Sequence, residues 1–169
     1  MKFKKLITTC LALVLLSACS TSSPFKSLTA GPCSGEQKQL VSAHISSQIS
    51  AISKQDWPLA YSFAAKSFQD SVDLTSFERI ITRSYQILIN NKEITFGKCQ
   101  IENSGFFQEV IVNSSYEKVE LLYRLSLVDQ KLGVQAADIT EQSSVLTTYP
   151  TIDSVINPFF ITTVTLSSR

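Results

Sequence analysis

The chain has few residues that could do chemistry, and among them Cys19 has the most distinctive surroundings. Lysines at positions 2, 4 and 5 precede an apolar segment over residues 6–16, and the small residues Ser17 and Ala18 stand directly before Cys19. A cationic start, a short apolar run and small residues before a cleavage point are the features of an export signal. Cleavage after Ala18 would make Cys19 the first residue of the mature chain, so the pattern indicates modification at its sulfur.

The run Leu16-Ser17-Ala18-Cys19 resembles the lipobox of bacterial lipoproteins. In such proteins diacylglycerol is attached to the cysteine thiol, the preceding peptide is removed, and the new amino group is often acylated, with palmitate a common chain. We therefore expect a signal peptide over residues 1–18 and membrane attachment through lipid on Cys19, because two or three acyl chains make release slow. The apolar segment is about half of the ~20 residues that a membrane-spanning helix needs. A plain secretory signal is the nearest alternative, but it does not require a cysteine.

The residue after the cysteine bears on location. In the sorting rule of enteric Gram-negative bacteria, aspartate at this position retains a lipoprotein at the inner membrane, whereas serine favours the outer membrane. The residue here is Ser20. The resemblance therefore implies a place in the cell envelope, at the outer membrane facing the periplasm if the cell is Gram-negative.

Two of the four cysteines remain once Cys10, inside the signal, and Cys19 are set aside. Export places Cys33 and Cys99 in an oxidising compartment, where an even number of cysteines usually means a disulfide. Closing a loop of this size stabilises a fold by roughly 4 kcal/mol in the chain-entropy model. The alternative is a pair of unpaired buried thiols. A redox site is disfavoured because the chain has no Cys-x-x-Cys spacing.

The remaining candidates for catalysis or metal binding are isolated. His44 is the only histidine, so any Ser-His-Asp or Cys-His site has to include it, yet it lies beside an apolar helical stripe and fits a helix-surface residue better. Asp70 and Asp73 lack the further oxygen ligands and glycine bend of a Ca²⁺ loop, and we interpret them as solvated loop charges. No zinc ligand set, glycine-rich phosphate loop or Gly-x-Ser-x-Gly motif is present. We expect no catalytic residue, metal or cofactor.

Charge and length narrow the class further. Removing the signal leaves 151 residues, which fits one compact domain. The mature chain has twelve basic against fourteen acidic residues, a net charge of about −2, with no Lys/Arg run. Nucleic-acid binding depends on phosphate neutralisation, so we do not expect a nucleic-acid partner.

Three helices are expected after a tether over residues 19–35, which is rich in Ser, Thr, Gly and Pro. The first, over 36–54, has apolar residues at helical spacing: Val41, Ile45, Ile49 and Ile52. The second, over 57–69, follows Asp56 as N-cap and places on one side Trp57, Ala60, Tyr61, Ala64 and Phe68. The third begins at a capping box, Thr75-Ser76-Phe77-Glu78, and carries Phe77, Ile80, Ile81, Ser84 and Tyr85.

After Asn90-Asn91 the apolar period changes to the alternation of β-strands. The clearest strand runs from Val119 to Leu127, and Asp129-Gln130 is expected to turn it into a partner strand over 132–139 as a hairpin. Helices followed by a meandering antiparallel sheet predict an α+β domain over residues 36–140. The C-terminal extension, 141–169, is apolar but interrupted by prolines, and it is either an added strand or an arm that packs on the sheet or on a partner.

Several of these segments together resemble a bacterial family, domain of unknown function 4864. The segments are Ile49-Ser50-Ala51-Ile52-Ser53-Lys54-Gln55-Asp56-Trp57, Ala60-Tyr61-Ser62-Phe63-Ala64, Ser76-Phe77 to Ser84-Tyr85-Gln86, and Leu122-Tyr123-Arg124-Leu125 turning into Lys131-Leu132-Gly133-Val134. The resemblance covers about 40–140 and implies a cone-like α+β fold, with N-terminal helices on a curved antiparallel sheet, in the superfamily of nuclear transport factor 2, ketosteroid isomerase, limonene epoxide hydrolase and similar domains. Leu132 stands where relatives tend to have tryptophan, and the extension lies outside the pattern.

Such cones often enclose a pocket between helices and sheet. The candidate lining residues are the aromatic ones that face the core: Trp57, Tyr61, Phe77, Tyr85 and Tyr123. Strand alternation directs Tyr123 inward and sends Glu120 and Arg124 to the opposite face, so no carboxylate is directed into the pocket. The same aromatic residues would also suit a fully packed core.

Together these features predict a lipid-anchored envelope domain that binds a small apolar molecule or an envelope protein without catalysing a reaction. The first alternative is a small-molecule isomerase or hydrolase of the cone superfamily, which would require an ionisable residue buried in a closed pocket. The second is a structural partner in an envelope assembly that acts through the extension.

Overall fold

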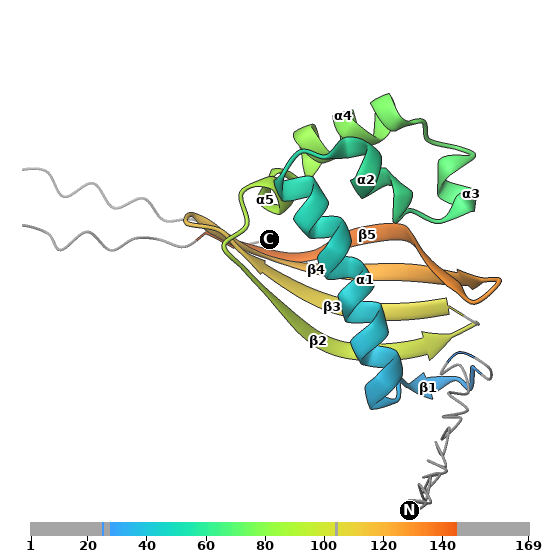
Figure 1. The fold of residues 1–169 in the computed structure, drawn as a ribbon. Coiled ribbons are helices and arrows are strands. Elements are labelled where there is room, and N and C mark those ends of the chain that lie inside the picture. The colour runs from blue at the N-terminus through green and yellow to red at the C-terminus, as the bar shows by residue number, and fades with distance from the viewer. Residues whose placement is uncertain (1–24, 26–27, 104, 145–169) are drawn as a thin grey trace, which may run out of the picture.

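The computed structural model describes residues 25, 28–103 and 105–144, and it has helices on one face of an antiparallel sheet (Figure 1). In the described part, the helices and strands follow in the order β1 (Gly31–Pro32), α1 (Gly35–Ser53), α2 (Trp57–Ser62), α3 (Lys66–Gln69), α4 (Leu74–Ser84), α5 (Gln86–Ile89), β2 (Glu93–Glu102), β3 (Gly105–Asn113), β4 (Glu117–Val128) and β5 (Lys131–Ser144). The strand order in the sheet is β1-β2-β3-β4-β5. This confirms the predicted α+β class.

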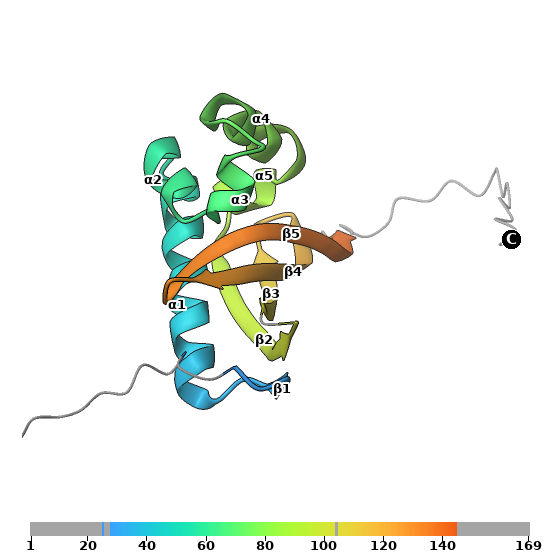
Figure 2. The same ribbon diagram turned by 90° about the vertical axis from the view of Figure 1, so that its right-hand side faces the viewer.

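Helix α1 is the longest described helix and crosses the sheet (Figures 1 and 2). It packs one face into the core. The four residues of its predicted stripe are at most 1% exposed. Ser34 begins the helix with a capping box, because its hydroxyl accepts from the Gln37 amide (3.2 Å) while the Gln37 side-chain oxygen accepts from the Ser34 amide (2.8 Å). The predicted helix is confirmed within a residue at each end.

The sheet is curved, and it carries three β-bulges. The register against the neighbouring strand shifts once in β2, between Phe96 and Cys99, and twice along the β4–β5 pair, where Gln135 and Thr140 are the extra residues of β5. An extra residue bends the strand and increases its twist. The predicted hairpin is confirmed, since Asp129 and Gln130 have positive φ values of 50° and 62°, as expected in a two-residue hairpin turn.

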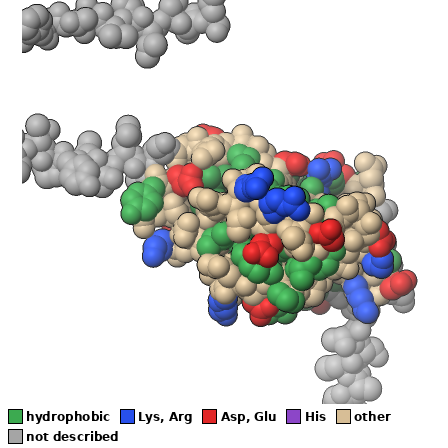
Figure 3. Space-filling model, turned by 90° about the horizontal axis from the view of Figure 1, so that it is seen from above, with side chains coloured by type: hydrophobic (Ala, Val, Ile, Leu, Met, Phe, Trp, Pro, Cys, Tyr) green, Lys and Arg blue, Asp and Glu red, His purple; other side chains and the backbone are tan. Residues whose placement is uncertain are grey.

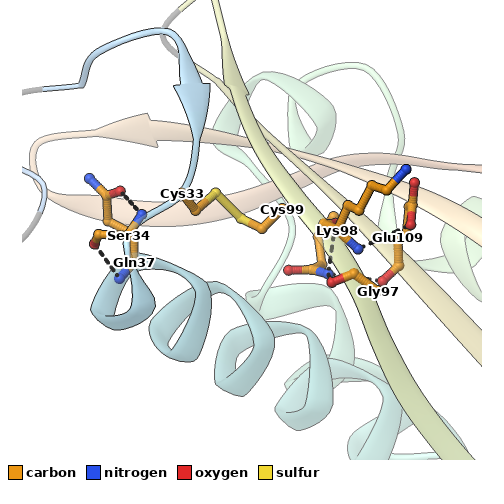
Figure 4. Close-up of a disulfide and its surroundings, with 8 residues drawn as sticks. Cys33, Ser34, Gln37, Gly97, Lys98, Cys99 and Glu109 are labelled. Carbon is orange, nitrogen blue, oxygen red and sulfur yellow. Dashed lines mark hydrogen bonds between the residues drawn. A yellow bond between two sulfur atoms is a disulfide. The ribbon is translucent and has the colours of Figure 1, made fainter.

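The bulge in β2 is held by side chains of β3 (Figure 4). The buried Gln108 amide group donates toward the carbonyls of Gly97 (3.2 Å), Lys98 (3.0 Å) and Glu109 (2.9 Å). The Glu109 carboxylate folds over Gly97 and accepts from the Lys98 amide at 3.0 Å. A Cβ at Gly97 would lie 2.7 Å from this carboxylate, so the position accommodates only glycine without a shift.

Disulfide Cys33–Cys99 joins the segment before α1 to β2, beside the bulge (Figure 4). The two Cα atoms are 5.4 Å apart, and the Cys33 amide donates to the Cys99 carbonyl at 3.0 Å. Within the segment 19–35 that we expected as a tether, Gly31–Pro32 pairs with β2 as an edge strand, and Phe25 packs edge-on against Phe106 with ring centroids 5.5 Å apart. The folded domain therefore begins before residue 36.

The predicted second helix is wrong in its length, because the chain leaves the helix after Ser62. Segment 63–65 lies against β5: the Val134 amide donates to the Phe63 carbonyl (2.9 Å), and the Ala65 amide donates to the Val134 carbonyl (2.8 Å). Ala64 and Val134 form a parallel bridge. These pairings with the strand replace the helical ones, and α3 then starts at Lys66. Asp56 is the N-cap of α2 as predicted, accepting from the Leu59 amide at 3.1 Å.

Helix α4 starts two residues earlier than the capping box at Thr75 predicted. Its N-cap is Asp73, whose carboxylate accepts from the Ser76 amide at 2.7 Å. A carboxylate at the N-cap also interacts favourably with the helix dipole, so Asp73 displaces Thr75 from this role. The helix ends at Ser84, and a separate short helix, α5, follows Tyr85.

The core lies between the helices and the inward side of β2–β5. The alternation in β4 is as predicted. The buried residues of β3 and β4 include Phe106, Val110, Val112, Val119, Leu121, Tyr123 and Leu125. The sheet continues to Ser144, beyond the expected domain end at residue 140. The remainder of the expected extension, 145–169, and the expected signal peptide, 1–18, lie outside the described residues.

Replacing Gly133 with alanine should destabilise the domain. A Cβ at Gly133 would lie 2.5 Å from the Ala65 Cα, a contact between two backbones that side-chain rotation cannot relieve. We expect Gly133→Ala to lower the free energy of unfolding by about 1–3 kcal/mol, as measured by urea denaturation of the mature chain.

Gly35→Ala is the matched control, because nothing lies within 4 Å of a Cβ built at Gly35. It should leave the free energy of unfolding unchanged or raise it by up to about 1 kcal/mol through helix propensity. Equal stabilities of the two variants would contradict close docking of the 63–65 segment on β5.

Candidate ligand-binding cavity

A cavity of about 180 Å³ lies between the helices and the β4–β5 end of the sheet. Most of the side chains in its wall are aliphatic or aromatic. They come from α1, α3, α4, α5, β4 and β5 and from the segments between these elements. The lining residues are Gln48, Ile52, Ala64, Phe68, Phe77, Ile80, Ile81, Tyr85, Leu88, Tyr123, Val134, Gln135, Ala136, Ala137 and Asp138. Ile80 and Asp138 are exposed, so they mark the side on which the cavity reaches the surface.

Two polar side chains of the wall are held by backbone carbonyls. The Tyr85 hydroxyl donates to the Ala137 carbonyl at 2.7 Å, which fastens the end of α4 to β5. The side-chain amide of Gln48, which is 3% exposed, donates to the Ala60 carbonyl at 3.3 Å. Burial raises the pKa of the Tyr85 hydroxyl, and the nearby Asp138 carboxylate adds to the shift, so this hydroxyl stays protonated.

Tyr123 lies at the sheet side of the cavity and is 1% exposed. Burial raises the pKa of its hydroxyl well above the ordinary value, and the neighbouring Tyr85 contributes in the same direction. Its cross-strand partner is Ala137, whose side chain shares the inward face. The small alanine opposite the large tyrosine leaves room at this point of the wall.

Three of the five predicted lining residues, Phe77, Tyr85 and Tyr123, line the cavity together. Tyr61 stacks at a tilt on Phe77, with ring centroids 5.6 Å apart, and its hydroxyl hydrogen-bonds to the Val72 carbonyl at 2.6 Å. It therefore anchors the loop before α4. Trp57 is partly buried against the core at the start of α2 and is not a lining residue.

Sequence reasoning missed the lining residues that are not aromatic. Gln48 sits among the buried positions of α1, where its helical phase with Ile45 and Ile52 was a usable signal. Ala137 had no such signal. A hairpin without a bulge would place Ala136 opposite Tyr123, and the extra residue Gln135 moves Ala137 into that position.

The carboxylate nearest to the cavity belongs to Asp138. It is exposed and pairs with Arg124 on the neighbouring strand, with the Arg124 Nε and Asp138 Oδ2 atoms 3.1 Å apart. No other carboxylate and no Lys, Arg or His side chain is among the lining residues. The cavity therefore offers neutral hydrogen-bonding groups and apolar surface.

His44 has a structural role that differs from the expected helix-surface position. Its Nε2 lies 3.0 Å from the Phe63 carbonyl, and its ring meets the Phe63 ring edge-on with centroids 5.2 Å apart. A carbonyl only accepts, so Nε2 carries the proton. Burial lowers the pKa of His44, and this outweighs the opposite effect of the hydrogen bond to Phe63. The histidine links α1 to the segment that docks on β5.

The remaining sequence candidates do not form a site in the described part of the chain. Asp70 pairs with Lys66 on the surface, and Asp73 is the N-cap of α4, where the hydrogen bonds from Ser76 lower the pKa of its carboxyl. No cluster of three or more His, Cys, Asp or Glu side chains suited to a metal ion occurs among the described residues. In the same residues no helix has both the length and the apolar character to span a membrane. Cys19 lies outside them.

The surface seen from the helix side carries both signs of charge (Figure 3). On this face Lys and Arg side chains are interspersed with Asp and Glu and with small apolar areas. This face therefore lacks the continuous basic area that would attract a polyanion.

Lowering the pH should destabilise the domain through His44. Because the folded-state pKa is below the unfolded value of about 6.5, the unfolded chain binds the proton more readily, and stability falls as the pH drops through this region. Urea unfolding at about pH 7.5 and about pH 5.5 should show this loss in the native sequence. In His44→Gln, which keeps a donor for the Phe63 carbonyl but does not titrate, the loss should be smaller. Equal pH dependence in both proteins would contradict a neutral buried His44.

Among the comparisons with known proteins, a match was found with one domain family. No curated protein and no solved structure matches it significantly. The model of one family, described as Domain of unknown function (DUF4864), matches residues 34–145. This range runs from the N-cap of α1 to the residue after β5, so it covers the helices α1–α5, the strands β2–β5 and the whole cavity wall. The chain therefore belongs to the family of domain of unknown function 4864.

Proposed function

We propose that this chain is a lipid-anchored protein of the bacterial cell envelope whose domain binds a small apolar molecule in the cavity between α4 and β5. The cavity is the observation that carries the proposal. It is concave, mostly apolar and furnished with a few polar groups, which is the usual character of small-molecule sites. Its volume of about 180 Å³ is close to that of an engineered protein cavity that binds benzene.

The anchor is the second part of the proposal. It rests on the lipobox-like run ending at Cys19, and the neighbouring Ser20 favours the outer membrane in a Gram-negative cell. The Cys33–Cys99 disulfide fits export to an oxidising compartment. The domain would then hold its ligand close to the membrane surface.

We also propose that the domain is related to the nuclear transport factor 2-like superfamily. Helices on one face of a curved, antiparallel and unclosed sheet support this relation. A cavity between the helices and the sheet is what such a relation implies.

The alternative of an isomerase or hydrolase is less well supported. Acid–base chemistry in an apolar cavity needs a buried ionisable group with a shifted pKa. The cavity's carboxylate, that of Asp138, is exposed and paired with Arg124. The third hypothesis, an assembly role for residues 145–169, concerns a segment outside the described residues.

A cavity-filling substitution tests the binding proposal. The probe is ethylbenzene, titrated into ¹⁵N-labelled residues 20–169, which lack the signal and Cys19, and followed by amide chemical shifts. We expect saturable shifts around the cavity. Ala137→Leu places extra methyl groups opposite Tyr123 and should weaken binding by roughly tenfold or more. Ala43→Leu, at an exposed α1 position outside the cavity wall, should not change the affinity.

Absence of saturable shifts in the native sequence would overturn the binding proposal. Equal affinities in the native chain and Ala137→Leu would show that ethylbenzene binds elsewhere on the protein. Both results are read from the same titration.

Replacing Cys19 tests the anchor. Cys19→Ser removes the thiol that would receive diacylglycerol, so the full-length chain expressed in bacteria should no longer incorporate a labelled fatty acid and should keep its signal peptide. Cys10→Ser, inside the signal, is the control and should remain labelled and processed. Labelling of Cys19→Ser would contradict the proposed attachment site.

A further inference from the structure

The hydroxyl of Tyr123 is a buried donor that has no use within the described domain. Tyr123 is 1% exposed and lines the cavity, and its hydroxyl makes no hydrogen bond to any described residue. This hydroxyl is not fully enclosed, because Gln108 Oε1 is the one completely buried side-chain atom without a partner among the described residues. The partly buried Tyr85 and the buried Gln48 differ, because Tyr85 donates to Ala137 and Gln48 donates to Ala60. Hydroxyls in protein interiors nearly always have a partner, so this one is available to donate to a ligand in the cavity.

We propose that the cavity takes a small neutral molecule with an oxygen acceptor, such as a ketone or an ester, and that the Tyr123 hydroxyl donates to this oxygen. The inference rests on the proposed binding function and adds the chemical class of the ligand. The apolar walls contributed by Phe77, Ile81 and Leu88 receive the hydrocarbon part. The acceptor oxygen of the ligand would lie on the sheet side of the cavity, next to Tyr123 on β4.

The charges around the cavity select a neutral ligand. No cationic side chain lines the wall, and the Asp138 carboxylate stands at the exposed rim, so an anionic ligand would be desolvated without a counter-charge. Burial keeps the Tyr123 hydroxyl protonated, which makes it a donor at any physiological pH. A ligand oxygen that accepts a hydrogen bond without carrying a charge fits both conditions.

The volume limits the ligand to about one ring with a short substituent. A cavity of about 150 Å³ holds benzene, and the cavity here is about 180 Å³. Larger ligands of the same chemistry would have to extend past the exposed Ile80 at the cavity's surface side.

Three probes of one shape but different polarity test the inference on residues 20–169 of the native sequence by the same chemical-shift titration. Ethylbenzene has no acceptor, acetophenone has a neutral carbonyl, and benzoate has a charged carboxylate. One added hydrogen bond to a buried donor should make acetophenone bind roughly threefold to tenfold more tightly than ethylbenzene. Benzoate should bind more weakly than either.

Two tyrosine variants locate the donor. Tyr123→Phe should remove the preference for acetophenone while retaining the binding of ethylbenzene. Tyr116→Phe is the matched control, because that side chain is 79% exposed and does not line the cavity, so the preference should persist in it. The comparison of probes on the native chain stands even if a variant fails to fold.

The outcomes separate this inference from the binding function. If ethylbenzene and acetophenone bind the native chain equally, the binding function stands and the inference is wrong. If the preference exists but survives Tyr123→Phe, the donor is another group and the inference is again wrong. If none of the three probes binds, the proposed function itself fails.

Discussion

Two backbone hydrogen bonds between the 63–65 segment and Val134 hold the helical part of the domain against the sheet. They link residues about seventy positions apart and close one side of the cavity, because Ala64 and Val134 both belong to its wall. The Phe63 carbonyl accepts from both Val134 and His44, so the same atom ties β5, the segment and α1 together. This contact requires Gly133, since a side chain there would overlap the backbone of Ala65.

The cavity is a consequence of this arrangement and of the bends in the sheet. The docking of the 63–65 segment sets the distance between α2–α3 and β5, and the Tyr85 hydrogen bond to Ala137 sets the position of the end of α4. The bulge at Gln135 then brings Ala137 opposite Tyr123. An alanine beside a buried tyrosine leaves open volume, and Tyr123 lines this volume.

The disulfide acts at the β1–β2 edge of the sheet, whereas the cavity borders β4 and β5. Cys33–Cys99 fastens the start of the domain to β2, next to the bulge that Gln108 and Glu109 stabilise. Closing a loop of this length reduces the entropy of the unfolded chain and stabilises the fold by roughly 4 kcal/mol. For a domain whose folding free energy is of the order of 5–15 kcal/mol, this is a substantial share. The stability of the fold therefore does not depend only on the contacts around the cavity.

Sequence patterns were sufficient to predict those helices, strands and turns that are determined by residues close together in the chain. The stripe of Val41, Ile45, Ile49 and Ile52 predicted α1 because burial of one helical face is periodic. The alternation of β4 predicted that Tyr123 points inward, and Asp129-Gln130 predicted the hairpin. The break after Ser62 was not predictable in this way. Its cause is Val134, a distant residue whose backbone groups compete with the helix for hydrogen bonds.

The sequence by itself determined the α+β class, the lipobox-like start and the pair of cysteines that form the disulfide. It also determined which aromatic residues face the interior. Only the tertiary structure decided that Tyr85 and Tyr123 share a cavity while Tyr61 binds the Val72 carbonyl. The physical reason is that the periodicity of apolar residues shows which side chains face inward. The hydrogen-bond partner of an inward hydroxyl depends instead on the register between neighbouring strands. One bulge residue, Gln135, changes that register, so that Ala137 and not Ala136 lies opposite Tyr123.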